Sequence, residues 1–486
     1  PPRSTLFPYT TLFRSYFFYG GKHMSIFRKK EITVPVNDSG GMKKNLKTMD
    51  LIFLGIGAVV GTGIFVVTGV AAERYAGPGL VLSFLVAAAA IILSGLCYAE
   101  FASRIPVIGG PYAYMYVVFG EIVAWMTGWM IICEFFLAVS SVASGWSGYV
   151  HGFLDSLGFS LPQALSGAYN PTNGTYIDLI AMLVVVAVTF WVSLEAKTAL
   201  RLNNLMVFVK FGIILLFVLV GIFYVKPTNW QPFIPYGFSG VFSGAALVFF
   251  AFLGFDAVSM AAEEVKNPKK DIPKGIIGSI IISTLLYIVV TLVLTGIVPF
   301  TDLGVKDPVA FAMRFINHGA IATIISVGAI LTLLTVTIAM MYSLARVIYA
   351  ISKDGLLPQF MSKIDEKRHT PKNATYVAGF LAMVFAGVVP MEMLAELTNI
   401  VTLFYLMFLA LGIIKLRTMK GEPQAGEFKV PLVPVLPLIS IVVCAALMFQ
   451  LSLATWQVFG IAVVIGLAIY FFYGRHHSIV RFETKE

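Results

Sequence analysis

Long apolar runs, separated by short segments with charged residues, proline and glycine, repeat along most of the chain. A membrane-spanning helix needs about 20 apolar residues, and backbone groups in lipid must pair within their own segment, so these runs predict transmembrane helices. The sequence therefore predicts an all-α membrane protein with twelve transmembrane helices. The expected spans lie near 51–72, 79–103, 120–150, 177–195, 203–225, 240–265, 275–298, 318–351, 373–390, 394–416, 432–450 and 455–474.

Two of these runs contain helix-breaking signals. The first reads LIFLGIGAVVGTGIFVVTG and holds five glycines, and the sixth places Gly254 beside the intramembrane Asp256. Interrupted spans at matching positions of two halves are typical of inverted-repeat transporters with a site near the membrane midplane. For the first run alone, a close helix contact between small residues is an equal alternative.

The spacing of the two interrupted runs predicts two repeats of five spans, followed by a two-span unit. Two terminal segments are expected to be cytoplasmic, and an aromatic N-terminal stretch resembles translated cloning sequence more than a signal peptide. The expected boundaries are 1–23 for this stretch, 24–50 for the cytoplasmic N-terminal segment, 51–225 and 240–416 for the repeats (spans 1–5 and 6–10), 432–474 for spans 11 and 12, and 475–486 for the cytoplasmic tail.

Composition and charge agree with a membrane protein. The chain is 58% hydrophobic but 12% charged, whereas soluble domains carry about 25% charged residues. Its net charge of +9 comes from basic residues spread over many short loops, which argues against a nucleic-acid partner. The outer loops hold only Arg74, Lys226, Lys306 and Arg314, so the positive-inside rule predicts a multi-pass membrane protein with both termini cytoplasmic.

Backbone groups left unpaired at the two breaks predict the substrate. Amide groups of Gly61, Thr62 and Gly63 would face the cleft at the positive end of a helix dipole, which suits a carboxylate. Carbonyl groups at the second break would suit an ammonium group. A site with both features fits an α-amino acid. The carbonyl groups belong to Phe250, Ala251 and Leu253.

Four motifs resemble the amino acid-polyamine-organocation (APC) superfamily. Within it, the chain is similar to bacterial homologues of the cationic amino acid transporters, close to the ApcT-like proteins. The resemblance implies a LeuT-like 5+5 inverted repeat with discontinuous helices 1 and 6. The motifs are GAVVGTGIF, AEFASRIPVIGGPYAYMYVVFGE, FLGFDAVSMAAEEVKNPKKDIPKGI and SLARVIYAISKDGLLP.

The resemblance also implies roles for residues at the breaks. The substrate carboxylate would bind the amides of Thr62 and Gly63, with Val59 supplying a carbonyl. The amino group would meet the three carbonyls of the second break. Phe250 stands where similar transporters have a bulky residue that closes the site from outside, which implies an outer-gate role.

Lys210 lies inside the fifth span, where a charge is costly. Its alternative explanation is snorkelling of the side chain to the membrane surface. Because desolvation disfavours an ammonium ion, a buried lysine can exchange a proton near neutral pH. In ApcT-like proteins a lysine in this span resembles a stand-in for the sodium ion of related transporters, which implies a brace between spans 1 and 8, proton coupling, no sodium and no other cofactor.

Four further residues are candidates with alternatives left open. Glu134 is expected either to recognise the substrate or relay protons, or to be a packed, protonated side chain. Met340 falls where related transporters line the side-chain pocket, and favours small neutral over cationic substrates; core packing is its alternative. Glu263 and Arg346 are candidates for a cytoplasmic gate or for a solvated charge cluster.

The sequence gives no sign of an enzyme. All six histidines lie in loops, tails or span edges, so no metal site is expected, and no Walker lysine is present. The prediction is a secondary active transporter for proton-coupled symport of small neutral and cationic L-amino acids. A proton-independent exchanger and an amino acid-sensing transceptor are the alternatives. Its expected partners are the amino acid and membrane lipid, and a monomer is expected, with any small membrane partner unknown.

Overall fold

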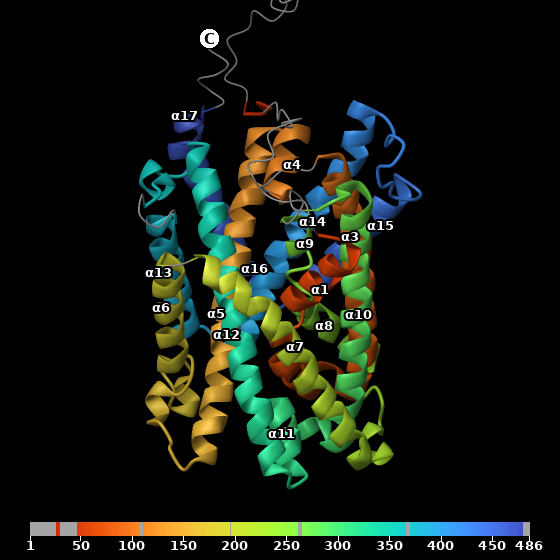
Figure 1. Ribbon diagram of the computed structural model, residues 1–486, viewed down its shortest axis with the longest axis vertical. Coiled ribbons are helices and arrows are strands. Elements are labelled where there is room, and N and C mark those ends of the chain that lie inside the picture. The colour runs from red at the N-terminus through yellow and green to blue at the C-terminus, as the bar shows by residue number, and fades with distance from the viewer. Residues whose placement is uncertain are drawn as a thin grey trace, which may run out of the picture.

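Helices that run roughly parallel to one axis make up almost the whole protein (Figure 1). Among the described residues no strand forms, and only three isolated β-bridges occur. The computed structural model describes residues 26–29, 46–105, 110–194, 196–260, 265–365 and 370–479 of the 486-residue chain. Glu263, one of the predicted gate residues, lies outside these ranges.

Each of the twelve apolar runs coincides with helical structure. The helices are α1 Thr48–Val59, α2 Thr68–Ala71, α3 Leu80–Arg104, α4 Gly110–Val118, α5 Glu121–Ser156, α6 Leu179–Leu194, α7 Ala196–Gly221, α8 Gly237–Val248, α9 Ala257–Met260, α10 Pro268–Ile297, α11 Pro308–Phe315, α12 Gly319–Lys353, α13 Lys372–Val388, α14 Met391–Lys420, α15 Val435–Phe449, α16 Leu453–Ile469 and α17 Arg475–His477.

Seven helical stretches within the described ranges are long and apolar enough to cross a membrane. They are Gly63–Arg104, Glu121–Ser156, Met206–Tyr224, Pro268–Ile297, Gly319–Lys353, Met391–Lys420 and Leu453–His477. Five shorter apolar helices accompany them: Thr48–Val59, Leu179–Leu194, Gly237–Phe252, Lys372–Val388 and Val435–Phe449. The number of membrane crossings therefore stays a prediction.

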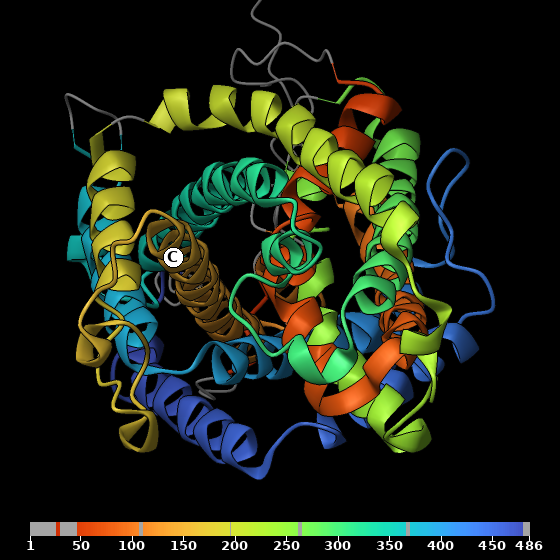
Figure 2. The same ribbon diagram turned by 90° about the horizontal axis from the view of Figure 1, so that it is seen from below.

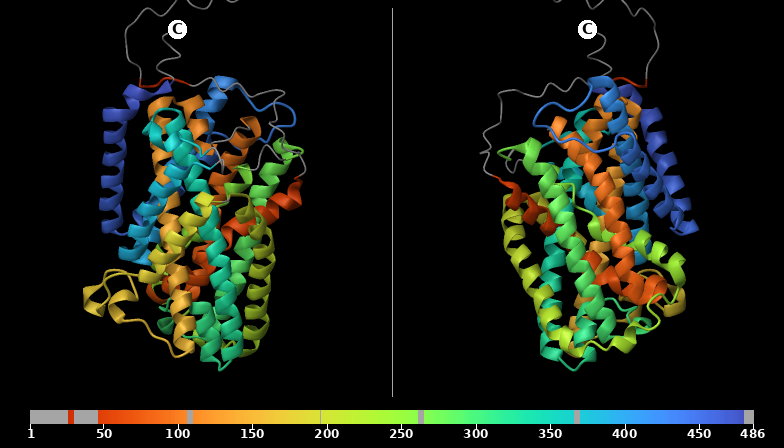
Figure 3. Two further views of the ribbon diagram at one scale, coloured as in Figure 1. Left: turned by 60° about the vertical axis from the view of Figure 1, so that its left-hand side comes forward. Right: turned by 90° about the vertical axis from the view of Figure 1, so that its right-hand side faces the viewer.

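The helices divide into an inner and an outer set. In its most apolar 18-residue stretch, α5 has 72% of its residues buried, whereas the last helix, Leu453–His477, has only 22%. α5 packs against α12 and α14, and α1 packs against α10. Seen along the bundle axis, α6 (yellow) and the last two helices (blue) lie at the perimeter (Figure 2), and the side views place the last helix at the outer edge (Figure 3).

The two ends of the bundle are named here by their short helices. The end that carries α4 and α17 is the α4 end, and the opposite end is the α11 end (Figure 1). α4 and α11 were not expected from the apolar pattern, because each is too short to form a span. α5 also continues to Ser156, about one and a half turns beyond the expected boundary at 150.

Both predicted helix breaks are present. α1 ends at Val59, Val60 is extended, and the helix restarts as a π-helical turn over Gly63–Val67. In the sixth run, α8 tightens into a 3₁₀ turn over Phe249–Phe252 before the backbone becomes extended. Gly254 then adopts a φ of 97°, a conformation that favours glycine, and α9 follows.

Candidate functional site

The two helix breaks lie in direct contact at the centre of the bundle. A Cβ atom placed on Gly63 would lie 2.3 Å from the Cα atom of Ala251, which is closer than any side chain allows. A Cβ atom on Gly254 would likewise lie 3.0 Å from the carbonyl oxygen of Ala58. Glycine at these positions therefore lets the two interrupted segments approach backbone to backbone, as the predicted site requires.

A tyrosine joins the two breaks. The hydroxyl group of Tyr287, on α10, lies 3.0 Å from the carbonyl oxygen of Val59 and 2.6 Å from that of Ala251. Its single proton serves one carbonyl at a time. Tyr287 is fully buried, so its hydroxyl group holds the ends of both broken helices in one place away from water.

The carbonyl groups expected to bind an ammonium group are partly engaged. The carbonyl of Phe250 accepts a hydrogen bond from the amide of Leu253 at 3.3 Å, and that of Ala251 faces Tyr287. A carbonyl oxygen has two lone pairs, so each of these groups can still accept a further hydrogen bond. The side chain of Phe250 is buried, with 5% of its surface exposed.

The opposite wall of the site comes from the restart of the first broken helix. Gly61 faces Val336 of α12, and Gly145 of α5 packs against the methyl group of Thr62. The Thr62 hydroxyl is buried and has no hydrogen-bond partner within the described part of the chain. First-turn amides of a helix lack an intrahelical acceptor, so this wall offers the donors that a carboxylate needs.

Lys210 reaches the first break from α7. It is 1% exposed, and its Nζ atom donates a hydrogen bond to the carbonyl oxygen of Gly57 at 2.5 Å. Lys210 lines a small hollow whose other residues are all apolar, among them Ile56, Val60 and Phe211. The side chain therefore does not reach toward the surface, and snorkelling does not describe its position in this structure.

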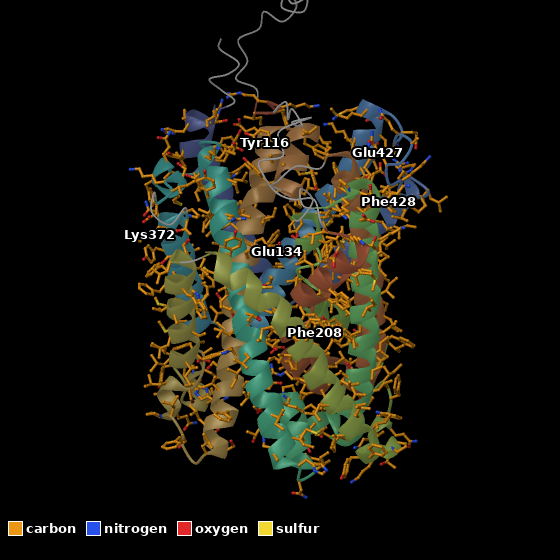
Figure 4. All side chains as sticks on the ribbon, in the orientation of Figure 1. Tyr116, Glu134, Phe208, Lys372, Glu427 and Phe428 are labelled. Atoms are coloured by element: carbon orange, nitrogen blue, oxygen red, sulfur yellow. The ribbon has the colours of Figure 1, made fainter. Side chains whose placement is uncertain are left out.

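Glu134 lies at mid-height in the bundle, away from both ends (Figure 4). Its carboxyl group interacts with the hydroxyl groups of Tyr405 and Thr402 on α14, and Asp256 is close enough to act on it electrostatically. One carboxyl oxygen, Oε2, has no hydrogen-bond partner among the residues described. This geometry is compatible with both predictions for Glu134. The side chain packs against a neighbouring helix, and one of its oxygens can still bind another group.

The remaining candidates lie further from the breaks. Met340 is one turn beyond Val336 on α12 and is partly buried against the core. Arg346 is exposed, and its guanidinium carbon lies 4.0 Å from the ring centroid of Tyr342. Glu263, the other gate candidate, lies outside the described ranges, so the gate stays a prediction.

Toward the α11 end, α5 contacts two other segments. Tyr149 of α5 donates a hydrogen bond to the carbonyl of Phe65, after the first break, at 2.7 Å. Gly148 of α5 packs against Lys306, in the segment before α11, and a Cβ atom there would lie 2.6 Å from the Lys306 Cβ atom. These contacts hold α5 against both segments on this side of the site.

Two residues of the site were missed by sequence reasoning. Tyr287 and Asn399 are neutral polar side chains inside apolar runs, and both hydrogen-bond to backbone carbonyls at the breaks. The candidates inside the apolar runs were backbone groups at the breaks, Phe250, Met340 and ionisable side chains, so neutral polar side chains away from the breaks were left out. Buried polar side chains need partners as well, so a polar group within a span is itself a usable signal.

Comparison with known proteins identifies the family. A family model described as amino acid permease matches residues 46–472, which include every helix from α1 to α16. The chain belongs to the amino acid permease family. This family lies within the APC superfamily, and the chain is a bacterial-type member similar to the cationic amino acid transporters. An amino acid permease with several long apolar helices is a multi-pass membrane protein.

Several permeases and transporters are similar to this chain over most of its length. The branched-chain amino acid permease BcaP of Bacillus subtilis (strain 168) is 46% identical, over 93% of this chain and 98% of its own. The methylthioribose transporter of the same strain is 45% identical, over 94% and 99%. Human cationic amino acid transporter 4 is 34% identical, over 81% of this chain and 63% of its own.

Proposed function

We propose that this permease is a proton-coupled symporter that carries neutral L-amino acids by alternating access. The proposed architecture has twelve spans, with α1 to α7 and α8 to α14 as two inverted repeats of five. The presence of one helix break in each half supports it. The observation that carries the proposal is the Lys210 ammonium group on the Gly57 carbonyl, one turn before the first break.

Proton coupling follows from this hydrogen bond. An ammonium group buried away from water is stabilised by the carbonyl near the end of α1, and loss of its proton removes the charge and weakens this hydrogen bond. Deprotonation would therefore loosen the hold of α7 on α1 during each cycle. Proton binding and helix position become linked without a sodium ion, and no other cofactor is proposed.

The proposed substrate contacts use the backbone at both breaks. The carboxylate binds the amides of Gly61, Thr62 and Gly63, and the carbonyl of Val59 accepts a hydrogen bond from the amino group. The amino group binds carbonyls of the second break, where Phe250 also closes the site toward the α11 end. The first and second breaks lie on opposite sides of the contact between Gly63 and Ala251, which supports this assignment. Glu134 is proposed as a polar neighbour of the site, able to take part in recognition or proton relay.

An apolar side-chain pocket is proposed to select the substrate. Met340, on the α12 face that includes Val336, presents a partly buried thioether rather than a charge. The two BcaP permeases among the relatives are named for branched-chain amino acids, which are neutral. Leucine and alanine are therefore the proposed substrates in preference to arginine. Arginine must still be tested, because other relatives are named cationic amino acid transporters.

The α4 end is proposed to face the cytoplasm of a bacterial cell. Lys269, Lys353, Arg417 and Lys429 lie at or near this end, as the positive-inside rule requires. The protein is proposed to work as a monomer in the cell membrane, surrounded by lipid. Under this orientation the α11 end faces the outside.

The test is uptake of labelled leucine, alanine and arginine into proteoliposomes, with and without an inward proton gradient. Saturable leucine or alanine uptake that rises with the gradient supports symport. Gradient-independent uptake that requires internal amino acid would replace symport with exchange. Absence of saturable uptake for all three would refute amino acid transport by this protein.

A second candidate substrate is a thiosugar. The 45% identity with a protein named methylthioribose transporter extends over nearly the full length of both chains, so the similarity alone does not separate the two substrate classes. Methylthioribose has no carboxylate and no ammonium group. Inhibition of labelled leucine uptake by excess methylthioribose would favour this candidate, and the absence of inhibition would exclude it.

A further inference from the structure

One asparagine of α14 holds the helix that leads into the second break. Asn399 is fully buried, and its Nδ2 atom lies 2.7 Å from the carbonyl oxygen of Ala246 and 2.9 Å from that of Leu247. Only the amide nitrogen can face two carbonyl oxygens, because the amide oxygen has no proton to donate. Both donors of Asn399 are therefore used on α8.

These two carbonyls lie where α8 changes geometry. The residues four positions further on are Phe250 and Ala251, whose amides would be their partners in a continuous α-helix. Instead the backbone forms a 3₁₀ turn over Phe249–Phe252. An outside donor at this point stabilises the transition, and it fixes the turn from which the carbonyls of the second break project.

The remaining atom of the side chain argues against a purely stabilising role. The Oδ1 atom of Asn399 is buried and accepts no hydrogen bond from the residues that the structure describes. A buried acceptor without a donor destabilises the folded state, and an apolar side chain of the same shape would avoid that penalty. What the asparagine contributes is therefore the pair of hydrogen bonds to α8.

We propose that Asn399 is a positioning residue for the amino group of the substrate. It holds the last turn of α8 so that the carbonyls of Ala251 and Leu253 point into the contact between the two breaks. Asn399 itself touches no substrate and acts through α8. The inference rests on the proposed amino acid transport. It gives α14 an indirect role in substrate recognition, through its hydrogen bonds to α8.

The neighbouring residue provides a matched control. Thr398 is equally buried, but its hydroxyl group donates to the carbonyl of Leu394 in its own helix, at 2.6 Å. Replacing Thr398 by valine removes a buried hydrogen bond of α14 without touching α8. An effect common to both positions would report on the packing of α14, and an effect confined to Asn399 reports on α8.

The experiment compares Asn399→Leu, Asn399→Asp, Asn399→Gln and Thr398→Val in proteoliposomes. Uptake of labelled leucine gives KM and Vmax, with Vmax expressed per amount of monodisperse protein. Loss of two hydrogen bonds that orient the site is expected to raise KM about tenfold in Asn399→Leu and Asn399→Asp, with Vmax little changed. Asn399→Gln, which keeps both donors, is expected to recover part of the KM, and Thr398→Val to match the wild type.

Two results would overturn the inference. One is a wild-type KM in either loss variant that folds. The other is loss of folded protein in both loss variants, which would make Asn399 a structural residue. Failure of the proposed function looks different, because the wild-type protein would then show no saturable leucine uptake, and the inference would fall with it.

Discussion

A single ammonium group carries the proposed coupling, so Lys210→Met tests it at the scale of one residue. Methionine keeps the length and removes the donor to Gly57. We expect leucine uptake that no longer responds to an inward proton gradient, because no group at this position can be protonated. Exchange of internal for external leucine should persist, and a pH profile of uptake measures the difference.

Phe208 provides the control for this substitution. It lies two residues before Lys210 on α7 and is 72% exposed, so Phe208→Met changes the same helix without touching the break. It should keep the wild-type response to the gradient. If Lys210→Met keeps that response, another residue must bind the coupled proton, and Glu134 is the next candidate.

The bridge between the breaks is also a single group. Tyr287→Phe removes one hydroxyl and leaves the ring in its contacts with Phe84 and Phe252. We expect uptake to fall about tenfold while the protein stays folded, because one oriented hydrogen bond at the site is lost. Tyr470→Phe, which removes a hydroxyl bonded to Glu121 near the α4 end, should leave uptake unchanged. Equal uptake by the two variants would contradict the bridging role.

These residues also show how far sequence reasoning reaches. Lys210 and the glycines at the breaks could be found because a charge or a helix breaker in an apolar run is unusual. Tyr287 and Asn399 could not be ranked, since neutral polar residues recur in spans and their partners depend on three-dimensional packing. The hydrogen bonds between distant helices are what the structure adds.

At the scale of helices, the contact between the two broken segments requires a glycine at position 63, because a side chain there would collide with Ala251. Gly63→Ala would place a methyl group 2.3 Å from the backbone of Ala251, so the two breaks would have to separate. We expect loss of leucine uptake. Gly460→Ala, on α16 and away from the site, is the control, since no atom lies within 4 Å of a Cβ placed there. Uptake measured for the two variants in parallel decides the point, and an active Gly63→Ala transporter would refute the close contact.

The positions of the helices were largely predictable, whereas their local forms were not. Apolar length locates the long helices, as for α10 and α12, because lipid imposes a minimum span. The π-helical turn after Gly63 and the 3₁₀ turn at Phe249–Phe252 depend on what lies opposite each break. α4 and α11 escaped prediction because a helix of eight or nine residues carries no length signal.

At the scale of the whole molecule, ion pairs and hydrogen bonds join distant segments at both ends. At the α11 end, Lys306 donates a hydrogen bond to the carbonyl of Ser166 at 2.7 Å, and Arg74 pairs with Glu392 of α14. The α4 end has a charge network that joins α3, α14 and the segment after α14, which includes Glu427 and Phe428 (Figure 4). Glu100, fully buried on α3, accepts hydrogen bonds from Arg417 at 2.6 and 3.0 Å and from the amide of Val430 at 2.8 Å.

Arg417→Met is expected to lower the stability of the whole protein. The substitution removes two charge-assisted hydrogen bonds from the buried Glu100, which keeps Arg104 at 3.3 Å as its remaining cation. Each hydrogen bond to a charged group is worth about 1.5–3 kcal/mol, so the apparent melting temperature in detergent should fall by several degrees. Lys429→Met removes a cation from the same region, but the Lys429 pair with Glu422 is exposed. There the Lys429 ammonium holds the pKa of the Glu422 carboxyl below its ordinary value, and water replaces that contact when it is lost. Lys429→Met should therefore have the melting temperature of the wild type. If Arg417→Met also has the wild-type melting temperature, apolar packing alone holds α3 against α14.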